Sequence, residues 1–165
     1  MKFETEVLHC SKYLLNTFEN EVNEVKNTIS LIKWKSDFGY KNSLHQTAYN
    51  KNFEDIFGDL EWEQKPFLSE SPKLIGDFRK NAVFVEVQFG NSSTIYRDFY
   101  KFQYGHRNGL LSLSILIVPT SPFKFFPNRD KKSISNMAEY HLAKRYFTIL
   151  QIQVPTIIIG LLPKN

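Results

Sequence analysis

Cysteine is almost absent from this sequence, since Cys10 is the only one in 165 residues. A single thiol excludes an intramolecular disulfide framework and any metal site built from several thiolates. Long apolar runs are also missing, because no segment reaches the ~20 apolar residues of a membrane-spanning helix. The polar, acidic start of the chain is not followed by the apolar core of a signal peptide. We expect a soluble cytoplasmic protein without a membrane partner, in which Cys10 is a small, partly buried apolar side chain.

Neither sign of charge dominates the sequence. It has 21 basic and 17 acidic residues, and the formal net charge is +4. This mild excess is compatible with a polyanionic partner, but also with an ordinary solvated surface. Hydrophobic residues make up 42% of the chain, as in typical globular proteins. The length suits a single domain over residues 1–165, with one sizeable core.

Apolar periodicity predicts an α/β fold in which helices flank a mixed sheet. Ser11 is the expected N-cap of the first helix, and Ser133 or Ser135 that of the last. Arg97 and Lys101 are expected on the solvent side of the middle helix. The expected elements, in chain order, are a helix over residues 11–35, strands at 74–78 and 82–89, a helix at 92–104, a buried strand at 110–118, a helix at 133–150 and a strand at 155–162.

Two stretches between these elements are expected to be irregular. Residues 36–52 are polar and indicate a surface loop, although such a stretch could instead line a nucleic-acid groove. A short element follows near 53–60, whose acids are expected on a solvated helix face but could alternatively supply an outer metal ligand. Residues 119–132 contain three prolines together with aromatic and basic side chains. We expect a long loop there whose aromatics and cations are exposed, and loops of this length inside a compact domain are usually functional or disordered.

Three polar residues in the predicted hairpin are candidates for a metal site. Glu86 and Gln88 lie two positions apart in an apolar strand, so they share one face of it. Asp77 precedes Glu86 by nine positions, and the turn should bring it back beside Glu86. Glu86 and Gln88 could instead lie on the exposed face of an amphipathic strand. If they are buried, a cation would offset the cost of burying the charge.

The chemistry of such a site would be phosphodiester hydrolysis. Two carboxylates and a main-chain carbonyl, here that of Val87, make a typical partial cage for Mg²⁺, which keeps several waters. The ion would activate a water and neutralise charge on a phosphoryl oxygen. Gln88 does not titrate, so its expected role is to orient the water or to hydrogen-bond the phosphate.

The pattern Asp77, Glu86, Gln88 resembles the catalytic motif of the PD-(D/E)XK nuclease superfamily. The wording Val-Glu-Val-Gln-Phe-Gly-Asn at 85–91 is similar to that of the BglII family of type II restriction endonucleases, in which Gln replaces the usual Lys. The resemblance continues from about 74 to 162, and in particular over 137–140 and 154–161. It implies a PD-(D/E)XK restriction-endonuclease-like fold with its catalytic core at 74–162 and a helical part at about 1–70.

Carried over by position, the resemblance implies that Asp77 and Glu86 bind the metal and that Gln88 completes the active site. Asn91 matches a polar position that meets DNA, and the loop at 125–132 occupies the region that reads bases in the major groove. The chain departs from the family pattern at Gly76, where Pro is nominal, and at Gly90, where a hydroxyl residue occurs. The expected DNA contacts are Asn91, Ser92, Arg97, Lys124, Asn128, Arg129 and Lys131.

Within that set, residue chemistry separates base readers from phosphate contacts. Asn128 can be bidentate to adenine and Arg129 to guanine. Lys124 and Lys131 are better suited to phosphates, which position a protein without specifying sequence. Alternatively, Asn128 and Arg129 only solvate a turn.

The resemblance implies a Mg²⁺-dependent type II restriction endonuclease that cuts double-stranded DNA at a short palindrome. A palindrome is two-fold symmetric, so a homodimer is expected, with the helix at 11–35 or at 133–150 as its seam. Its functional counterpart would be a cognate DNA methyltransferase. Two alternatives stay open: a structure-specific or repair nuclease of the same fold, and a catalytically inactive DNA-binding module.

Overall fold

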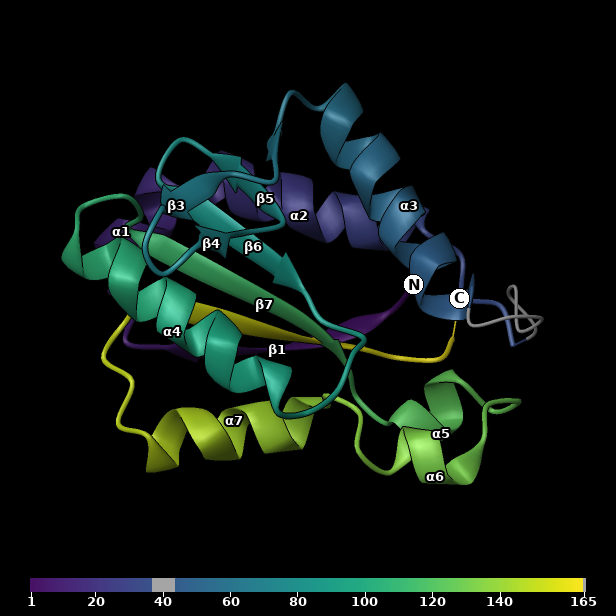
Figure 1. Cartoon of the computed structure of the whole chain (residues 1–165). Helices are drawn as coiled ribbons and strands as arrows, with labels where there is room; N and C mark the ends of the chain where they lie inside the picture. Colours follow the sequence, from purple (N-terminus) through teal and green to yellow (C-terminus); the bar gives the residue numbers. More distant parts are fainter. Residues whose placement is uncertain (37–43, 165) are drawn as a thin grey trace.

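A six-stranded mixed sheet forms the centre of the protein in the computed structural model, which describes residues 1–36 and 44–164 (Figure 1). The side chains of residues 44–47 are not described. The middle strands β6, β7 and β8 are parallel, and the outer pairs are antiparallel. In spatial order the strands are β1 (Phe3–Leu8), β8 (Thr156–Leu161), β7 (Leu113–Pro119), β6 (Val83–Val87), β5 (Phe78–Lys80) and β2 (Glu63–Gln64).

Helices cover both faces of this sheet. On one side lie α2 (Glu19–Leu31) and α3 (Leu44–Asp59), and on the other α4 (Thr94–Arg107) and α7 (Tyr140–Ile149). Because side chains alternate along a strand, Val85 joins the core under α2 and α3, whereas Phe84 joins the core under α4 and α7. Glu86 therefore points toward α4. A two-stranded ribbon, β3 (Phe67–Ser69) and β4 (Leu74–Ile75), leads into β5.

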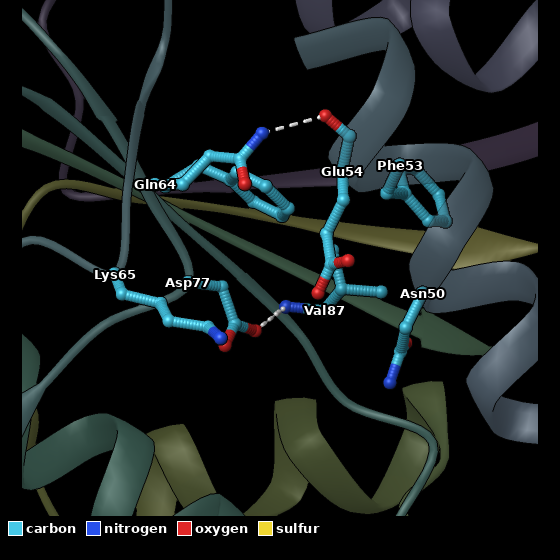
Figure 2. A pocket seen from close by; sticks show the side chains of 8 residues that line it. Asn50, Phe53, Glu54, Gln64, Lys65, Asp77 and Val87 are labelled. Carbon is cyan, nitrogen blue, oxygen red and sulfur yellow. Dashed lines mark hydrogen bonds between the residues drawn. The ribbon is translucent and has the colours of Figure 1, made fainter. Parts of the chain in front are cut away.

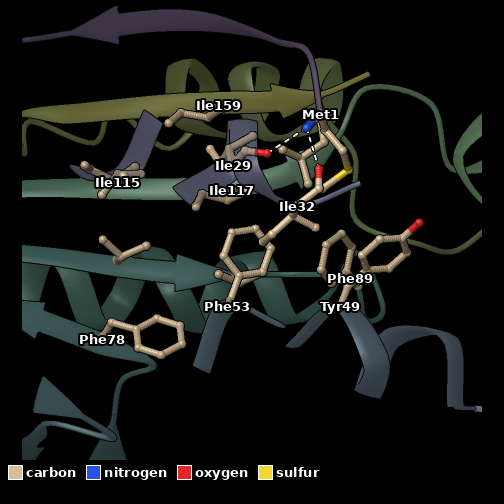
Figure 3. Close-up of a cluster of buried hydrophobic side chains, with 14 of the residues drawn as sticks. Met1, Ile29, Ile32, Tyr49, Phe53, Phe78, Phe89, Ile115, Ile117 and Ile159 are labelled. Atoms are coloured by element: carbon tan, nitrogen blue, oxygen red, sulfur yellow. Dashed lines mark hydrogen bonds between the residues drawn. The ribbon is translucent and has the colours of Figure 1, made fainter. Parts of the chain in front are cut away.

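Aromatic side chains fill much of the core under α2 and α3 (Figure 3). The rings of Tyr49, Phe89 and Phe125 lie within 5.9 Å of one another, centroid to centroid. Each fully buried ring of this kind contributes roughly 1.5–3 kcal/mol of transfer free energy. At one end of this core the amino group of Met1 donates to the carbonyls of Ile29 and Ile32, at 2.7 and 2.5 Å. These contacts satisfy carbonyl groups at the end of α2.

The buried strand and the last strand are confirmed as β7 and β8, and the helix at 92–104 is confirmed as α4. The predicted hairpin is confirmed in its second strand, β6, but its first strand is displaced. Only Phe78 of the expected strand at 74–78 belongs to β5, which continues through Arg79 and Lys80, whereas Leu74–Ile75 form β4 in the ribbon. Ser11 caps its helix as expected, since its hydroxyl accepts from the Leu14 amide. The single helix expected over 11–35 is wrong. It is divided at Phe18 into α1 (Lys12–Thr17) and α2, and it ends at Leu31. The edge strand β1 was not predicted at all.

The predicted loop at 36–52 is also wrong from residue 44 onward, because α3 begins there and continues through the short element expected at 53–60. Residues 37–43 lie outside the described part of the chain. The helix expected at 133–150 is shorter than predicted. It begins at Tyr140, and Glu139 rather than Ser133 or Ser135 is its N-cap.

The segment 119–132 is not an extended loop with exposed aromatics. It contains α5 (Pro122–Phe125) and the start of α6 (Lys131–Ile134). Phe125 and Phe126 are fully buried in the core under α2 and α3, and only Phe123 of the three is exposed. The transfer free energy of two aromatic rings therefore anchors this segment to the body of the protein. No helix among the described residues is long and apolar enough to cross a membrane.

Candidate active site

Asp77 and Glu86 lie together where β5 and β6 begin to separate. The last register pair at this end is Phe78 with Val85, so Asp77 comes next to Glu86 one position beyond it. The amide of Val87 donates to Oδ2 of Asp77 at 2.8 Å and fixes that carboxyl group against β6. Asp77 is half-buried, and Glu86 is only 2% exposed. The predicted hairpin geometry is confirmed, and the alternative of an exposed strand face is wrong.

Helix α4 supplies two further charged groups to this pair. The ammonium of Lys101 lies 2.9 Å from Oε2 of Glu86 and 3.2 Å from Oδ1 of Asp98. Lys101 is 6% exposed and Asp98 is 2% exposed. The expectation that Lys101 faces solvent is therefore wrong. The expectation for Arg97 is confirmed, since that side chain is exposed.

The amide of Gln88 is held at both ends. Its Nε2 donates to Oδ2 of Asp98 at 2.8 Å, and its Oε1 accepts from the main-chain N–H of Gly90 at 2.8 Å. A Cβ atom on Gly90 would lie 2.7 Å from that Oε1 atom. The missing side chain of Gly90 thus allows the amide to lie against the backbone. Asp77, Glu86, Lys101, Asp98 and Gln88 form one continuous polar cluster.

Burial dominates the electrostatics of this cluster. It raises the pKa of Glu86 well above its ordinary range, and the charges of Asp77 and Asp98 raise it further, against the opposing charge of Lys101. Burial likewise raises the pKa of Asp77 and of Asp98. Desolvation alone would lower the pKa of Lys101, but the charges of Glu86 and Asp98 outweigh it and raise that pKa. Such shifted groups are typical of functional sites.

The arrangement of oxygen atoms fits a hard divalent cation. Within the described part of the chain, Oε1 of Glu86 is buried and has no hydrogen-bond partner, although Oε2 is paired with Lys101. An unpaired buried carboxylate oxygen is costly unless a cation is close. No three His, Cys, Asp or Glu side chains among the described residues are placed to hold a metal together. Asp77, Glu86 and the carbonyl of Val87 would therefore leave several coordination positions to water, which suits Mg²⁺.

A small cavity opens beside Asp77 toward α3 (Figure 2). Its lining includes polar side chains from two segments that the sequence reasoning did not include in the site. In Figure 2 the side chains of Lys65 and Glu54 are directed toward the space beside the Asp77 carboxyl group. Asn50 lines the same cavity, and its Oδ1 atom is buried without a partner among the described residues. This cavity gives Asp77 an opening on the α3 side, and Glu86 is not part of its lining.

Asn91 and Arg129, two of the expected DNA contacts, line one surface hollow with Gly90 and Ser133. Asn91 stands just ahead of α4, and its Oδ1 accepts from the Ser93 amide at 2.9 Å. Nε of Arg129 donates to Oγ of Ser133 at 3.1 Å. The hollow adjoins Gln88 through Gly90, so the structure places these two residues next to the candidate site.

The other expected DNA contacts lie outside this hollow. Lys124 on α5 and Lys131 on α6 are exposed. Asn128 is exposed, and its Nδ2 donates to the carbonyl of Ser36 at 2.9 Å, so one of its two N–H donors is engaged. Ser92 is half-buried, and its amide donates to the Asn136 carbonyl at 2.7 Å. Their roles toward DNA stay predictions.

Comparison with known proteins identifies the family. The model of the family "Restriction endonuclease BglII/BglIII" matches residues 3–161. The chain belongs to this family. It is a type II restriction endonuclease that acts on DNA. The fold agrees with that of solved BglII structures. BglII complexed with a DNA 16-mer superposes with a TM-score of 0.77 at 18% identity, covering 98% of this chain and 76% of that one.

Free BglII superposes with a TM-score of 0.68, also at 18% identity, covering 98% of this chain and 80% of that one. No curated protein sequence matches the chain. At 18% identity the similarity to both structures shows the fold alone. The assignment to the family rests on the match to the family model. The resemblance read from residues 74–162 is therefore confirmed, and family membership extends it to the N-terminal part, which includes β1.

The sequence contained a signal for one of the residues that were missed. Asp98 has the same helical spacing as Ile95, Phe99 and Phe102, so it lies within the buried stripe of α4. An acidic residue inside an apolar stripe indicates a buried partner. Lys101 lies beside this stripe, and its contact with Glu86 depends on which strand α4 packs against. Sequence alone could not place Asn50, Glu54 and Lys65 beside Asp77, because the path of α3 relative to Asp77 is not local information.

Proposed function

We propose that this restriction endonuclease is Mg²⁺-dependent and hydrolyses phosphodiester bonds in double-stranded DNA at a short palindromic site. The pairing of half-buried Asp77 with buried Glu86, whose Oε1 is unpartnered among the described residues, is the observation that carries the proposal. These two carboxylates and the carbonyl of Val87 would hold the ion. When bound, Mg²⁺ supplies an activated water and neutralises charge on a phosphoryl oxygen.

The side chains around this pair have separable roles in the proposal. Glu86 and Asp77 provide negative oxygens on a rigid hairpin. Lys101 fixes the orientation of Glu86 from α4 and leaves one carboxylate oxygen for the ion. Gln88 hydrogen-bonds a reacting group without changing protonation, because an amide does not titrate. Gln88 therefore does not serve as a general base.

DNA binding would extend from this cluster across the adjoining surface. Asn91 and Arg129 line the hollow next to Gly90, which supports a role for both close to the cleaved strand. Lys124 and Lys131 are exposed and are proposed to contact phosphates, while Asn128 and Arg129 read bases in the major groove. Ser92 and Arg97, near the start of α4, are proposed as further contacts to the sugar–phosphate backbone of the DNA. The BglII complex with a DNA 16-mer supports DNA as the ligand.

A palindromic site requires two active sites related by two-fold symmetry. We therefore propose a homodimer with one site for each strand. The enzyme would work in the cytoplasm beside a cognate DNA methyltransferase that protects the host's own sites. Sedimentation of the protein with and without a cognate duplex tests the dimer, and a monomer that cuts both strands independently would contradict it.

Cleavage of plasmid and phage DNA tests the reaction. The parent should give discrete fragments with Mg²⁺ and none with EDTA, and run-off sequencing of the fragment ends should show one palindromic site. Asp77→Asn and Glu86→Gln should lose cleavage by at least about 10²-fold, because each removes a charged metal oxygen. Asp55→Asn, at an exposed acid paired with Lys51, is the matched control and should cut like the parent.

Cation binding gives a second reading that is independent of activity. Ca²⁺ or Mg²⁺ should raise the thermal unfolding midpoint of the parent, because a ligand of the native state adds RT ln(1 + [L]/Kd) to its stability. Glu86→Gln should lose this response. Full cleavage by both acid variants would show that the site is elsewhere. Nicking of branched substrates without a fixed fragment pattern would indicate a structure-specific nuclease instead.

A further inference from the structure

The orientation of the Gln88 amide is determined by its two partners. The main-chain N–H of Gly90 can only donate, so the atom that faces it must be Oε1. The carboxylate of Asp98 accepts hydrogen bonds, so the atom that faces it must be Nε2. Both partners therefore require the same orientation of the amide. Reversing the amide would place Nε2 against the Gly90 N–H and Oε1 against a carboxylate.

Asp98 is itself fixed by its surroundings. It is 2% exposed, and its other oxygen is paired with Lys101, which also binds Glu86. The contacts thus run without a gap from Glu86 through Lys101 and Asp98 to Gln88. These charge-assisted contacts restrain Lys101, Asp98 and the Gln88 amide, although Oε1 of Glu86 has no partner among the described residues.

Once these contacts are made, the amide has one N–H left. Nε2 carries two hydrogens, and Asp98 takes one of them; no other partner for Nε2 is found among the described residues. Oε1 is already engaged by Gly90. Phosphate oxygens only accept hydrogen bonds, and a charged acceptor makes the stronger bond. We propose that Asp98 is a positioning residue which, held by Lys101, fixes Gln88 as a hydrogen-bond donor to the scissile phosphate.

This inference rests on the proposed function, and it narrows the role of Gln88 from two options to one. In the alternative, Oε1 would accept from the attacking water and orient it. The two roles make opposite demands on the side chain at position 88. A donor role needs the N–H of an amide, whereas an acceptor role is filled equally well by a carboxylate.

An exchange of amide and acid between positions 88 and 98 separates these roles. In Asp98→Asn the new amide must turn its oxygen to Lys101, so its NH₂ group faces Nε2 of Gln88 and two donors meet. In Gln88→Glu two carboxylates face each other. In the double variant Asp98→Asn/Gln88→Glu, the new carboxylate accepts from the Gly90 N–H and from the new amide, whose oxygen still accepts from Lys101. The hydrogen-bond pattern and the total charge are then restored, but the side chain at position 88 has no N–H to donate to a phosphate.

The expected results follow for stability and for activity. Each single variant should lower the thermal unfolding midpoint, and the double variant should recover most of that loss, because residues that share a network are not additive. Single-turnover cleavage of a plasmid that the parent cuts should fall on the order of 10²-fold in Asp98→Asn, since a small misplacement near the reacting atoms has that effect. Affinity for the same DNA in Ca²⁺ should be little changed. The double variant should stay inactive although it is stable.

Two results would overturn the inference. If Asp98→Asn cleaves as fast as the parent, Asp98 does not position Gln88. If the double variant regains cleavage, the donor role of Gln88 is wrong. If the Asp98 variant fails to fold, Gly90→Ala decides. Its Cβ would lie 2.7 Å from Oε1 and displace it, whereas Oγ1 of Thr94 on α4 would lie at an ordinary contact distance of 3.7 Å. Unchanged cleavage would refute the need for a fixed amide.

The same measurements distinguish this inference from the proposed function. A parent that never cuts DNA with any divalent metal contradicts the proposed function. A parent that cuts, with Glu86→Gln inactive and Asp98→Asn fully active, leaves the proposed function intact and rejects only the inference. Asp55→Asn on the surface of α3 is the matched acid-to-amide control, and its midpoint and cleavage should follow the parent.

Discussion

Replacing Gly76 by alanine should destabilise the protein because Phe84 occupies the space a side chain would need. A Cβ atom there would lie 1.9 Å from Cζ of Phe84 and 2.6 Å from Cε1. Carbon atoms in contact prefer roughly 3.5–4.0 Å, so the ring would have to move by about 1.5 Å or more. Phe84 is fully buried in the core under α4 and α7, where neighbouring side chains surround it.

The size of the effect follows from two opposing contributions. Overpacking a buried site costs about 1–3 kcal/mol. Restricting the unfolded chain by a Gly→Ala change returns about 0.4–1 kcal/mol. The expected net loss is about 1–2 kcal/mol, or about 3–6 °C in the unfolding midpoint of a domain of this size. Because Asp77 is the next residue, cleavage should fall as well.

Urea and thermal unfolding of Gly76→Ala, Phe84→Leu and the double variant provide the assay. Phe84→Leu alone removes ring volume and should cost roughly 1–2 kcal/mol. In the double variant the smaller side chain makes room for the new Cβ, so the two losses should not add. Gly58→Ala is the matched control. This exposed helical position gains helix propensity of up to about 1 kcal/mol, and its new Cβ would meet only the end of the Gln64 side chain, at 3.0 Å, so this variant should not lose stability as Gly76→Ala does. A Gly76→Ala protein within about 0.5 kcal/mol of the parent, or strictly additive losses, would refute the steric argument.

Three further predictions concern the acid cluster and the DNA surface. The pKa of Glu86 in the folded protein lies above its ordinary value of 4.5, so the folded metal-free protein binds this proton more tightly than the unfolded chain does. The stability of the metal-free protein should therefore fall as the pH rises from 4.5 through the raised pKa. Mg²⁺ should oppose this fall. Melting in EDTA and in Mg²⁺ across this range checks the sign, and a metal-free midpoint that rises with pH would contradict it. Lys124→Ala should weaken binding to all duplexes alike and reduce the salt slope by about one, as measured by titration at several salt concentrations. Arg129→Ala should relax specificity at one base pair, at about 1–3 kcal/mol, and uniform weakening across sequences would instead place Arg129 on a phosphate.

The hairpin that holds Asp77 and Glu86 was predictable because its pairing is local. Two apolar runs separated by a short polar turn can meet in few ways, and the strand period of two places Glu86 and Gln88 on one face. The order of the later elements followed from apolar periodicity for the same reason. These features depend on residues close together in sequence, so the local pattern of apolar and polar residues is enough to predict them.

The features that were missed depend on distant contacts. β1 pairs with β8 across nearly the whole chain, and its residues Phe3–Leu8 alternate too weakly to indicate a strand alone. Phe125 and Phe126 follow prolines in the chain, and they are buried because they pack against rings from distant segments, among them Tyr49 and Phe89. Lys101 looked like a solvated cation because its acid partner Glu86 belongs to a different element. Whether such residues are buried depends on tertiary packing, which the local sequence pattern does not contain.

The polar cluster also links two binding events. When ionised, Asp77, Glu86 and Asp98 carry three negative charges against one positive charge on Lys101, a sum of −2. Without a metal ion, this net charge of −2 repels a DNA phosphate. One bound divalent ion brings the net charge of the cluster to zero and removes the repulsion. The affinity for DNA should therefore rise with the free concentration of a non-catalytic cation such as Ca²⁺. By linkage, DNA must raise the affinity for that cation by the same factor, so the enzyme holds its metal most tightly where it meets its substrate.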